Sequence, residues 1–163
     1  MAESGSVLRV PVLTGRAWAF ADGLRAEDIL PARFAALGPG AARRHLFVDV
    51  DATLAARIAP NDVLVGGQEL GGGAGAEAAA RALAAAGVIA VVAGSFADGF
   101  AEAVLAAGLP PLEVDAPAMF HTGHRMRLNL EAGTIANLSS GDRLPVRNLT
   151  EPLLDRLRAL LGR

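Results

Sequence analysis

The segment from residue 63 to residue 92 constrains the fold of this chain more than any other part of its sequence. Residues 63–65 (VLV) form a short apolar run typical of a buried strand, a glycine-dense loop follows at 66–75, and residues 76–86 are rich in alanine. Gly87 is typical of the residue that follows a helix, and residues 88–92 (VIAVV) indicate a second buried strand. This order predicts a right-handed βαβ unit with two parallel strands.

The remaining sequence predicts shorter elements around this unit. The apolar patterns and turn residues indicate a strand start near residues 10–12, extended chain at 15–20, a helix at 26–30, a loop at 38–44, a strand at 46–50, a helical turn at 53–58, a helix at 96–107 capped by Ser95, a strand after residue 109, short strands within 125–144, and a closing helix at 153–161. No repeat or linker interrupts them, so we predict a single α/β domain over residues 1–163. In it a mixed sheet carries the βαβ unit and an added β layer, and residues 1–8 form a tail.

Charge and hydropathy exclude several classes of function. The formal net charge is −2 and no Lys/Arg run marks a nucleic-acid face. No apolar stretch reaches the roughly 18 residues needed to span a membrane. The N-terminus lacks the basic-then-apolar pattern of a signal peptide. We therefore expect a cytoplasmic protein that binds neither nucleic acid nor membrane.

The chain has no cysteine, which excludes disulfides, thiolate catalysis and an iron–sulfur cluster held by this chain itself. Three histidines remain, and only His121 and His124 are close in sequence. They lie in a Gly-containing segment without the spacing of a known metal motif, so we expect no metal site and no cofactor within the chain.

The loop GGQELGGGAGAE, residues 66–77, is the clearest candidate for ligand binding. Six of its twelve residues are glycine, and a helix begins directly after it. Free backbone N–H groups and the positive end of a helix dipole suit a carboxylate or a phosphate. The loop lacks the Gly-Lys-Ser/Thr of a phosphate-binding P-loop and the acidic partner of a dinucleotide site. A tight turn that merely requires glycine is the alternative.

Several ordered motifs resemble the small subunit of isopropylmalate isomerase and the swivel domain of aconitase. The family pattern GxNFGCGSSREHA is similar to GQELGGGAGAEAA at residues 67–79, the pattern GI.AVIA.SFA.IF to AGVIAVVAGSFADGF, and GLP is present at 108–110. Upstream, DDINTDEIIPARY resembles the segment ending in EDILPARF, and GHRMRLNLEAGTI matches a later family pattern. The resemblance covers nearly the whole chain and implies an aconitase small-subunit-like swivelling β/β/α domain.

The chain departs from this family at the residues that carry its chemistry. The family's Ser-Ser-Arg supplies a catalytic base and groups that hold a substrate carboxylate, and the matching positions here are Ala74, Gly75 and Ala76. These side chains offer neither an exchangeable proton nor a hydrogen-bond donor. The family's Thr-Asp is replaced by Ala26 and Glu27. Ordinary aconitase chemistry is therefore not expected, since each lost transition-state group typically costs a hundredfold or more in rate.

Other polar residues near the loop become the candidates for chemistry. Carboxylates in an apolar cleft can act as acid and base, and histidines titrate near neutral pH. The candidate catalytic residues are Glu69, Glu27, Asp22, His121 and His124. The candidate substrate-binding residues are Gln68, Gly71, Gly72, Gly73, Ala74, Gly75 and Arg33, and Arg33 and Arg81 are the cations proposed for an anionic substrate.

Three functions remain open. The first is a repurposed metal-free enzyme, a lyase, isomerase or cyclase that acts on a small biosynthetic intermediate by acid–base chemistry. The alternative is a divergent small subunit of a hydro-lyase, similar to 3-isopropylmalate dehydratase, that pairs with an iron–sulfur large subunit. A non-catalytic binding module is the third. The expected partners are accordingly a small-molecule substrate and either further copies of this chain or a large hydro-lyase subunit.

Overall fold

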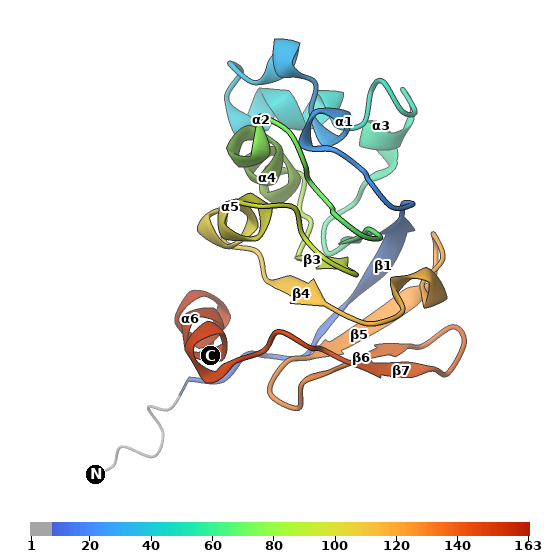
Figure 1. The fold of residues 1–163 in the computed structure, drawn as a ribbon, viewed down its shortest axis with the longest axis vertical. Helices are drawn as coiled ribbons and strands as arrows, with labels where there is room; N and C mark the ends of the chain where they lie inside the picture. Colours follow the sequence, from blue (N-terminus) through green and yellow to red (C-terminus); the bar gives the residue numbers. More distant parts are fainter. Residues whose placement is uncertain (1–7) are drawn as a thin grey trace.

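The structure, a computed structural model, describes residues 8–163 and is built on one seven-stranded mixed sheet (Figure 1). The strand order is β4-β3-β2-β1-β5-β6-β7. Strand β1 (Leu13–Ala19) lies in the middle of the sheet and pairs parallel with β2 and antiparallel with β5. The sheet therefore has a parallel half and an antiparallel half, which meet at β1.

The predicted βαβ unit is confirmed in the parallel half. Strand β2 (Val63–Val65) pairs parallel with β3 (Ala90–Ala93), with Leu64 opposite Val91. Strand β4 (Pro111–Glu113) continues the parallel pairing. Helices α4 (Ala76–Ala85) and α5 (Phe100–Ala106) cover one face of these strands, and their apolar side chains share a core cluster with Leu64 and Val91.

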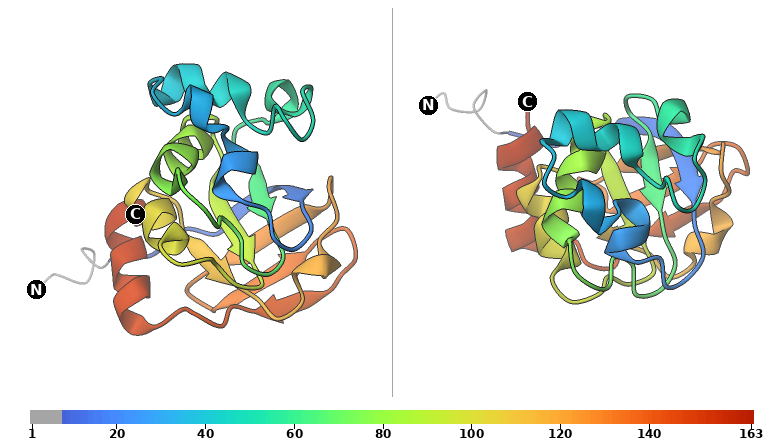
Figure 2. Two further views of the ribbon diagram at one scale, coloured as in Figure 1. Left: turned by 45° about the horizontal axis from the view of Figure 1, so that its top comes forward. Right: turned by 90° about the horizontal axis from the view of Figure 1, so that it is seen from above.

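The antiparallel half forms the added β layer. It consists of β5 (Arg125–Asn129), β6 (Thr134–Asn137) and β7 (Arg143–Pro145). Met126 and Leu128 alternate with exposed arginines, as a half-buried strand requires. The sheet curls so that these side chains meet the other face of β2 and β3 in a second core cluster, which helix α6 (Glu151–Leu161) closes (Figure 2).

The segment between β1 and β2 differs from prediction. Residues 46–50 are turns and not a strand, because Phe47 has φ +59° and its carbonyl accepts from the nearby Val50 N–H at 2.9 Å, so the chain closes local turns. The predicted loop at 38–44 contains a helical turn. The short elements here are α1 (Ala26–Ile29), η2 (Ala32–Phe34), α2 (Pro39–Ala42), η3 (Arg43–His45) and α3 (Leu54–Arg57), and η4 (Pro117–Met119) follows β4.

Two boundaries also need correction. Helix α5 begins at Phe100 after a Gly99 cap, so Ser95 is not its N-cap. Strand β1 starts just after Pro11, as predicted for a strand start. A proline in a strand pattern also favours an edge strand, but β1 is central in the sheet. Of the predicted tail, residues 1–7 lie outside the described part of the chain. Within residues 8–163, no helix has the length and apolarity required to cross a membrane.

Candidate functional site

The glycine loop leaves the carboxyl end of β2 and is fixed on both sides by backbone hydrogen bonds. On one side Gly23 N–H donates to Gln68 O at 2.8 Å and Gly71 N–H donates to Leu24 O at 2.7 Å. On the other side Leu70 N–H donates to Ser95 O at 3.0 Å. The loop is thus held between the segment after β1 and the segment after β3, at the edge where open α/β sheets bind ligands.

Two of the loop glycines are required by close packing. Gly71 has φ +88°, and a methyl group there would collide with the ring of Phe100. A methyl group on Gly67 would collide with the carboxylate of Asp22. For these positions a turn that needs glycine is a sufficient explanation.

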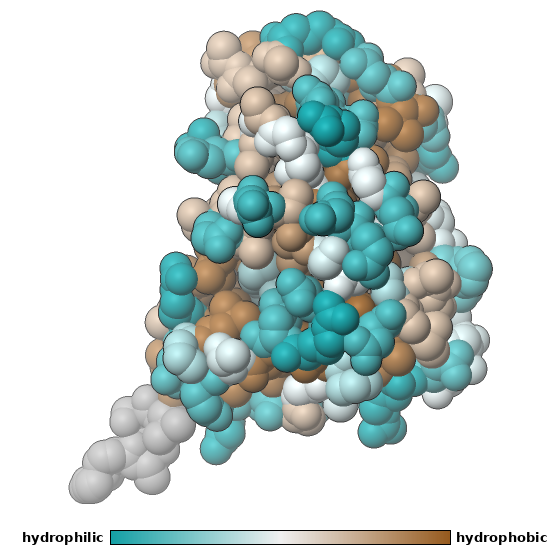
Figure 3. Space-filling model, in the orientation of Figure 1, coloured by the Kyte–Doolittle hydropathy of each residue, from teal (hydrophilic) through white to brown (hydrophobic). Residues whose placement is uncertain are grey.

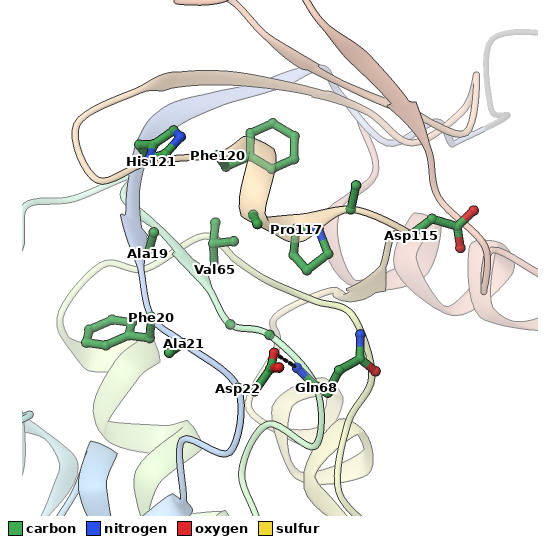
Figure 4. A pocket seen from close by; sticks show the side chains of 14 residues that line it. Ala19, Phe20, Ala21, Asp22, Val65, Gln68, Asp115, Pro117, Phe120 and His121 are labelled. Atoms are coloured by element: carbon green, nitrogen blue, oxygen red, sulfur yellow. Dashed lines mark hydrogen bonds between the residues drawn. The ribbon is translucent and has the colours of Figure 1, made fainter.

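A pocket of about 460 Å³ lies where β1 and β2 end, and we call it the strand-end pocket (Figure 4). Its walls come from residues 19–22, from residues 65–68 and from the crossover at residues 115–121. Asp22 and Gln68 lie at one end of the view and Phe120 and His121 at the other, with Val65 between them. The pocket therefore has an apolar middle with polar groups at its ends.

Asp22 and Gln68 are positioned by the loop itself. Asp22 Oδ1 accepts a hydrogen bond from Gln68 N–H at 2.8 Å. The side-chain Oε1 of Gln68 accepts from the Ser95 hydroxyl at 3.1 Å, and Ser95 Oγ accepts from Glu69 N–H at 2.8 Å. Ser95 thus fixes both residues before the glycine run, a role the sequence did not reveal because its position suggested a helix cap.

The two candidate histidines have different surroundings. His121 is exposed and lines the strand-end pocket. His124 Nδ1 lies 2.9 Å from Asn137 Nδ2 and accepts from His121 N–H at 3.2 Å. These contacts hold His124 in the turn before β5, and His124 is not among the residues that line the strand-end pocket.

Glu69 lies in a separate depression of about 380 Å³, the loop hollow, with Arg25, Gly72 and Asp98. Its backbone has φ +55°, a left-handed conformation that few residues with a side chain adopt. The Arg25 guanidinium pairs with Glu27 at 2.6 Å and covers Gly73, where a methyl group would strike it. The structure thus separates Glu69 and Glu27 from Asp22, instead of joining all three carboxylates in one cleft.

Arg33 contributes to neither depression. Its guanidinium binds Asp49 through two hydrogen bonds of 2.6 and 2.9 Å, in the segment between β1 and β2. Hydrogen bonding and the opposite charge hold the pKa of Asp49 below its usual value. Arg81 lies on α4 between the shallow grooves that flank this helix.

The positions that match the family's Ser-Ser-Arg stand at the start of α4. Ala74 and Gly75 are exposed, Gly75 caps the helix, and Ala76 is its first residue. This surface offers backbone N–H groups and the methyl groups of Ala74 and Ala76 but no polar side chain. The ionisable candidates Asp22, Glu27, Glu69 and His121 are all exposed to solvent.

Three charged residues near the loop escaped the sequence analysis. Arg25 and Asp98 line the loop hollow, and Asp115 lines the strand-end pocket. Asp115 Oδ1 binds Arg147 Nη1 at 2.9 Å, and Arg147 also binds Glu113 and the carbonyl of Gly94. These contacts join β4, the start of the crossover and the segment after β7, so no local sequence pattern could reveal them.

Comparison with known proteins agrees with this architecture. Residues 49–117 match the sequence model of the aconitase C-terminal domain. The crystal structure of a 3-isopropylmalate dehydratase from Methanocaldococcus jannaschii superposes with a TM-score of 0.79, at 24% identity over 84% of this chain and 82% of that one. Fold and site therefore define an α/β domain of the aconitase small-subunit type.

Relatives in sequence show which family within this class the chain belongs to. The 3-isopropylmalate dehydratase small subunit of Nautilia profundicola is 35% identical over 131 residues, which cover 80% of this chain and 79% of the relative. The isopropylmalate/citramalate isomerase small subunit of Methanocaldococcus jannaschii is 31% identical over 150 residues, or 91% and 89% of the two chains. The chain belongs to the family of 3-isopropylmalate dehydratase small subunits, and its loop lacks the Ser-Ser-Arg side chains of the family pattern.

Proposed function

We propose that the chain is the small subunit of a two-subunit hydro-lyase and forms one wall of an active site that a large subunit completes. The relatives named as small subunits match along most of their length, which favours this function over the metal-free enzyme. The observation that carries the proposal is the exposure of Asp22, Glu69 and His121. Acid–base catalysis gains most of its strength in a site that excludes water, and a second protein surface would provide that.

The iron–sulfur cluster that the family resemblance implies does not suit the residues of this chain. The chain has no cysteine, and no group of three or more His, Asp or Glu within residues 8–163 could hold a metal ion. A cluster would therefore have to be bound by the large subunit. The part of this chain is to bind and orient the substrate and to exchange protons at Asp22, Glu69 or His121.

The metal-free enzyme remains the second candidate because the strand-end pocket lies within this chain. It brings Asp22, Gln68 and His121 to one apolar depression without a partner. A homo-oligomer that buries this pocket would also exclude water from it.

Co-purification separates the two functions. We expect the chain, co-expressed with large hydro-lyase subunits from the same genome, to form a brown heteromeric complex with hydro-lyase activity. A colourless homo-oligomer that is active alone would contradict the proposal.

A matched pair of variants locates the contact. Ala74 and Ala85 are exposed alanines in the glycine loop and at the far end of α4. Ala74→Arg should weaken the complex at least about tenfold by obstructing the loop face, whereas Ala85→Arg should leave it unchanged. Equal effects of the two variants would contradict docking through the loop.

A further inference from the structure

Arg147 reaches from the segment after β7 to the segment that holds the glycine loop. Its guanidinium donates to the carbonyl of Gly94, to Asp115 at 2.9 Å and to Glu113 at 3.2 Å. Gly94 is buried, and within residues 8–163 its carbonyl accepts from Arg147 and from no backbone N–H. A buried carbonyl without a partner is costly, so the position of the Gly94–Ser95 peptide depends on this arginine.

Backbone and side-chain contacts fix Arg147 against the edge of β4. Arg147 N–H donates to Glu113 O at 2.8 Å. The side chain of Asn148 accepts from Glu113 N–H and donates to Pro111 O, both at 2.9 Å. Figure 3 shows hydrophilic side chains gathered over the area where β4 and the segment after β7 lie in Figure 1. The contact is at the surface, and Arg147 is 41% exposed, so its side chain can be changed without opening the core.

The Gly94–Ser95 segment in turn holds the first part of the glycine loop. Gly94 N–H donates to Gly67 O at 2.9 Å, and Ser95 O accepts from Leu70 N–H at 3.0 Å. Between these two contacts, the Ser95 hydroxyl accepts from Glu69 N–H at 2.8 Å. Three contacts therefore join the loop to the segment whose first carbonyl the guanidinium binds.

Glu69 is the loop residue that depends most on this support. Its φ of +55° is a left-handed conformation, which a residue with a side chain keeps only where its surroundings hold it. We propose that Arg147 is a positioning residue of the active-site wall. Through Gly94 and Ser95 it holds the backbone of Glu69 in the conformation that places this residue in the loop hollow. This inference rests on the proposed function, in which Glu69 is one of the residues that exchange protons with the substrate.

Amide exchange in the free full-length chain tests the positioning without a large subunit. In Arg147→Gln the guanidinium is lost, and we expect the amides of Glu69 and Leu70 to exchange with solvent at least about tenfold faster. Gly71 N–H donates to Leu24 O on the other side of the loop, so its amide should exchange as in the wild type. NMR resolves these amides one by one.

Two further variants keep this test decisive. Glu113→Gln removes the charge of one ion pair but keeps an acceptor oxygen and the contact of Arg147 with Gly94, so the loop amides should exchange as in the wild type. Arg147→Lys keeps the positive charge, but one ammonium lacks the planar fork that reaches Asp115 and the Gly94 carbonyl together. It should speed exchange of the same loop amides, and it carries the test if Arg147→Gln does not fold.

Kinetics of an active complex with a large subunit separate positioning from structural support. Arg147→Gln should lower kcat at least about tenfold, because a small displacement of an acid or base has that effect, and should leave KM within about twofold. Arg143 is an exposed arginine on β7, and Arg143→Gln should change neither constant. A purely structural role of Arg147 would reduce the yield of complex and leave kcat per complex unchanged.

Three results would overturn the inference: unchanged exchange of the Glu69 and Leu70 amides in the Arg147 variants, an equal effect of Glu113→Gln, or an unchanged kcat in an active complex. The proposed function is tested separately. If no large subunit binds the wild-type chain while the loop amides respond to Arg147, the small-subunit role fails and the control of the loop by Arg147 stands. An active wild-type complex in which Arg147→Gln has no effect removes only the inference.

Discussion

Gly71 shows how single residues fix the glycine loop. It combines φ +88° with a position against the buried ring of Phe100, so Gly71→Ala should lower the free energy of unfolding by about 3 kcal/mol. Gly99 has φ +85° but open space where a methyl group would lie, and Gly99→Ala should cost about 1 kcal/mol. Urea unfolding of both variants measures the difference, and equal losses would show that the contact with Phe100 does not matter.

Glu69 is the residue whose role in catalysis is most easily separated from stability. It is exposed, and its backbone N–H is held by Ser95 whatever its side chain. In an active preparation, Glu69→Gln should lower turnover by about tenfold to ten-thousandfold, the range for loss of a general acid or base. The free energy of unfolding should hardly change.

Glu102, an exposed carboxylate on α5, provides the control for this substitution. Glu102→Gln should leave turnover as it is. Full activity in Glu69→Gln would rule out the Glu69 carboxylate as acid or base and leave Asp22 and His121 as the candidates.

Sequence reasoning identified residues that lie around the loop but not their grouping. Asp22, Gln68 and His121 share one pocket, a grouping that the sequence analysis did not make. Glu69 lies in the loop hollow because the segment after β1 is hydrogen-bonded to the glycine loop. These hydrogen bonds join residues more than 40 positions apart in the sequence. His124 is engaged by Asn137, a contact set by the pairing of β5 and β6.

At the scale of elements, the strongly periodic segments were predictable. The βαβ unit and α4 were predicted from apolar runs and from the glycines that end each run, and both are confirmed. The start of α5 was not predictable, because the Ser95 hydroxyl accepts a hydrogen bond from Glu69 N–H in the glycine loop and does not cap a helix. Residues 46–50 were mistaken for a strand because Phe47, Val48 and Val50 are residue types typical of strands, although only Leu46 and Phe47 are buried in the core.

One element-scale contact predicts a dependence of stability on pH. Glu131, in the turn between β5 and β6, binds Arg158 of α6 at 2.7 Å and accepts from Val10 N–H at 2.9 Å. Hydrogen bonds from Arg158 and Val10, with the charge of the two nearby arginines, lower the pKa of Glu131 to about 2. A carboxylate whose pKa is depressed on folding stabilises the protein above its unfolded pKa and loses that contribution as pH falls through its folded pKa.

The wild-type chain should therefore lose about 1 kcal/mol of this stabilisation between about pH 4.5 and pH 2. Glu131→Gln cannot titrate, so its unfolding free energy should depend less on pH in that window. Thermal unfolding of both proteins across the window measures the difference. Parallel curves would contradict a depressed pKa at Glu131.

At the scale of the whole molecule, strand β1 organises the site. It pairs parallel with β2 and antiparallel with β5, so the curled sheet turns at its end and brings the crossover at residues 115–121 over the ends of β1 and β2 (Figure 2). The family resemblance predicted this architecture. The charge around the strand-end pocket could not be predicted from the sequence. It depends on which arginines form ion pairs with carboxylates elsewhere in the fold.

Hydrogen exchange of the complex with a large subunit tests most directly whether the glycine loop forms one wall of a shared site. The backbone amides of residues 72–74 belong to an exposed or half-buried stretch of the loop in the free chain. We predict that complex formation slows their exchange at least about tenfold, together with the amides of residues 22–25, while α6 exchanges as before. A stable complex in which the loop amides exchange as fast as in the free chain would contradict this claim.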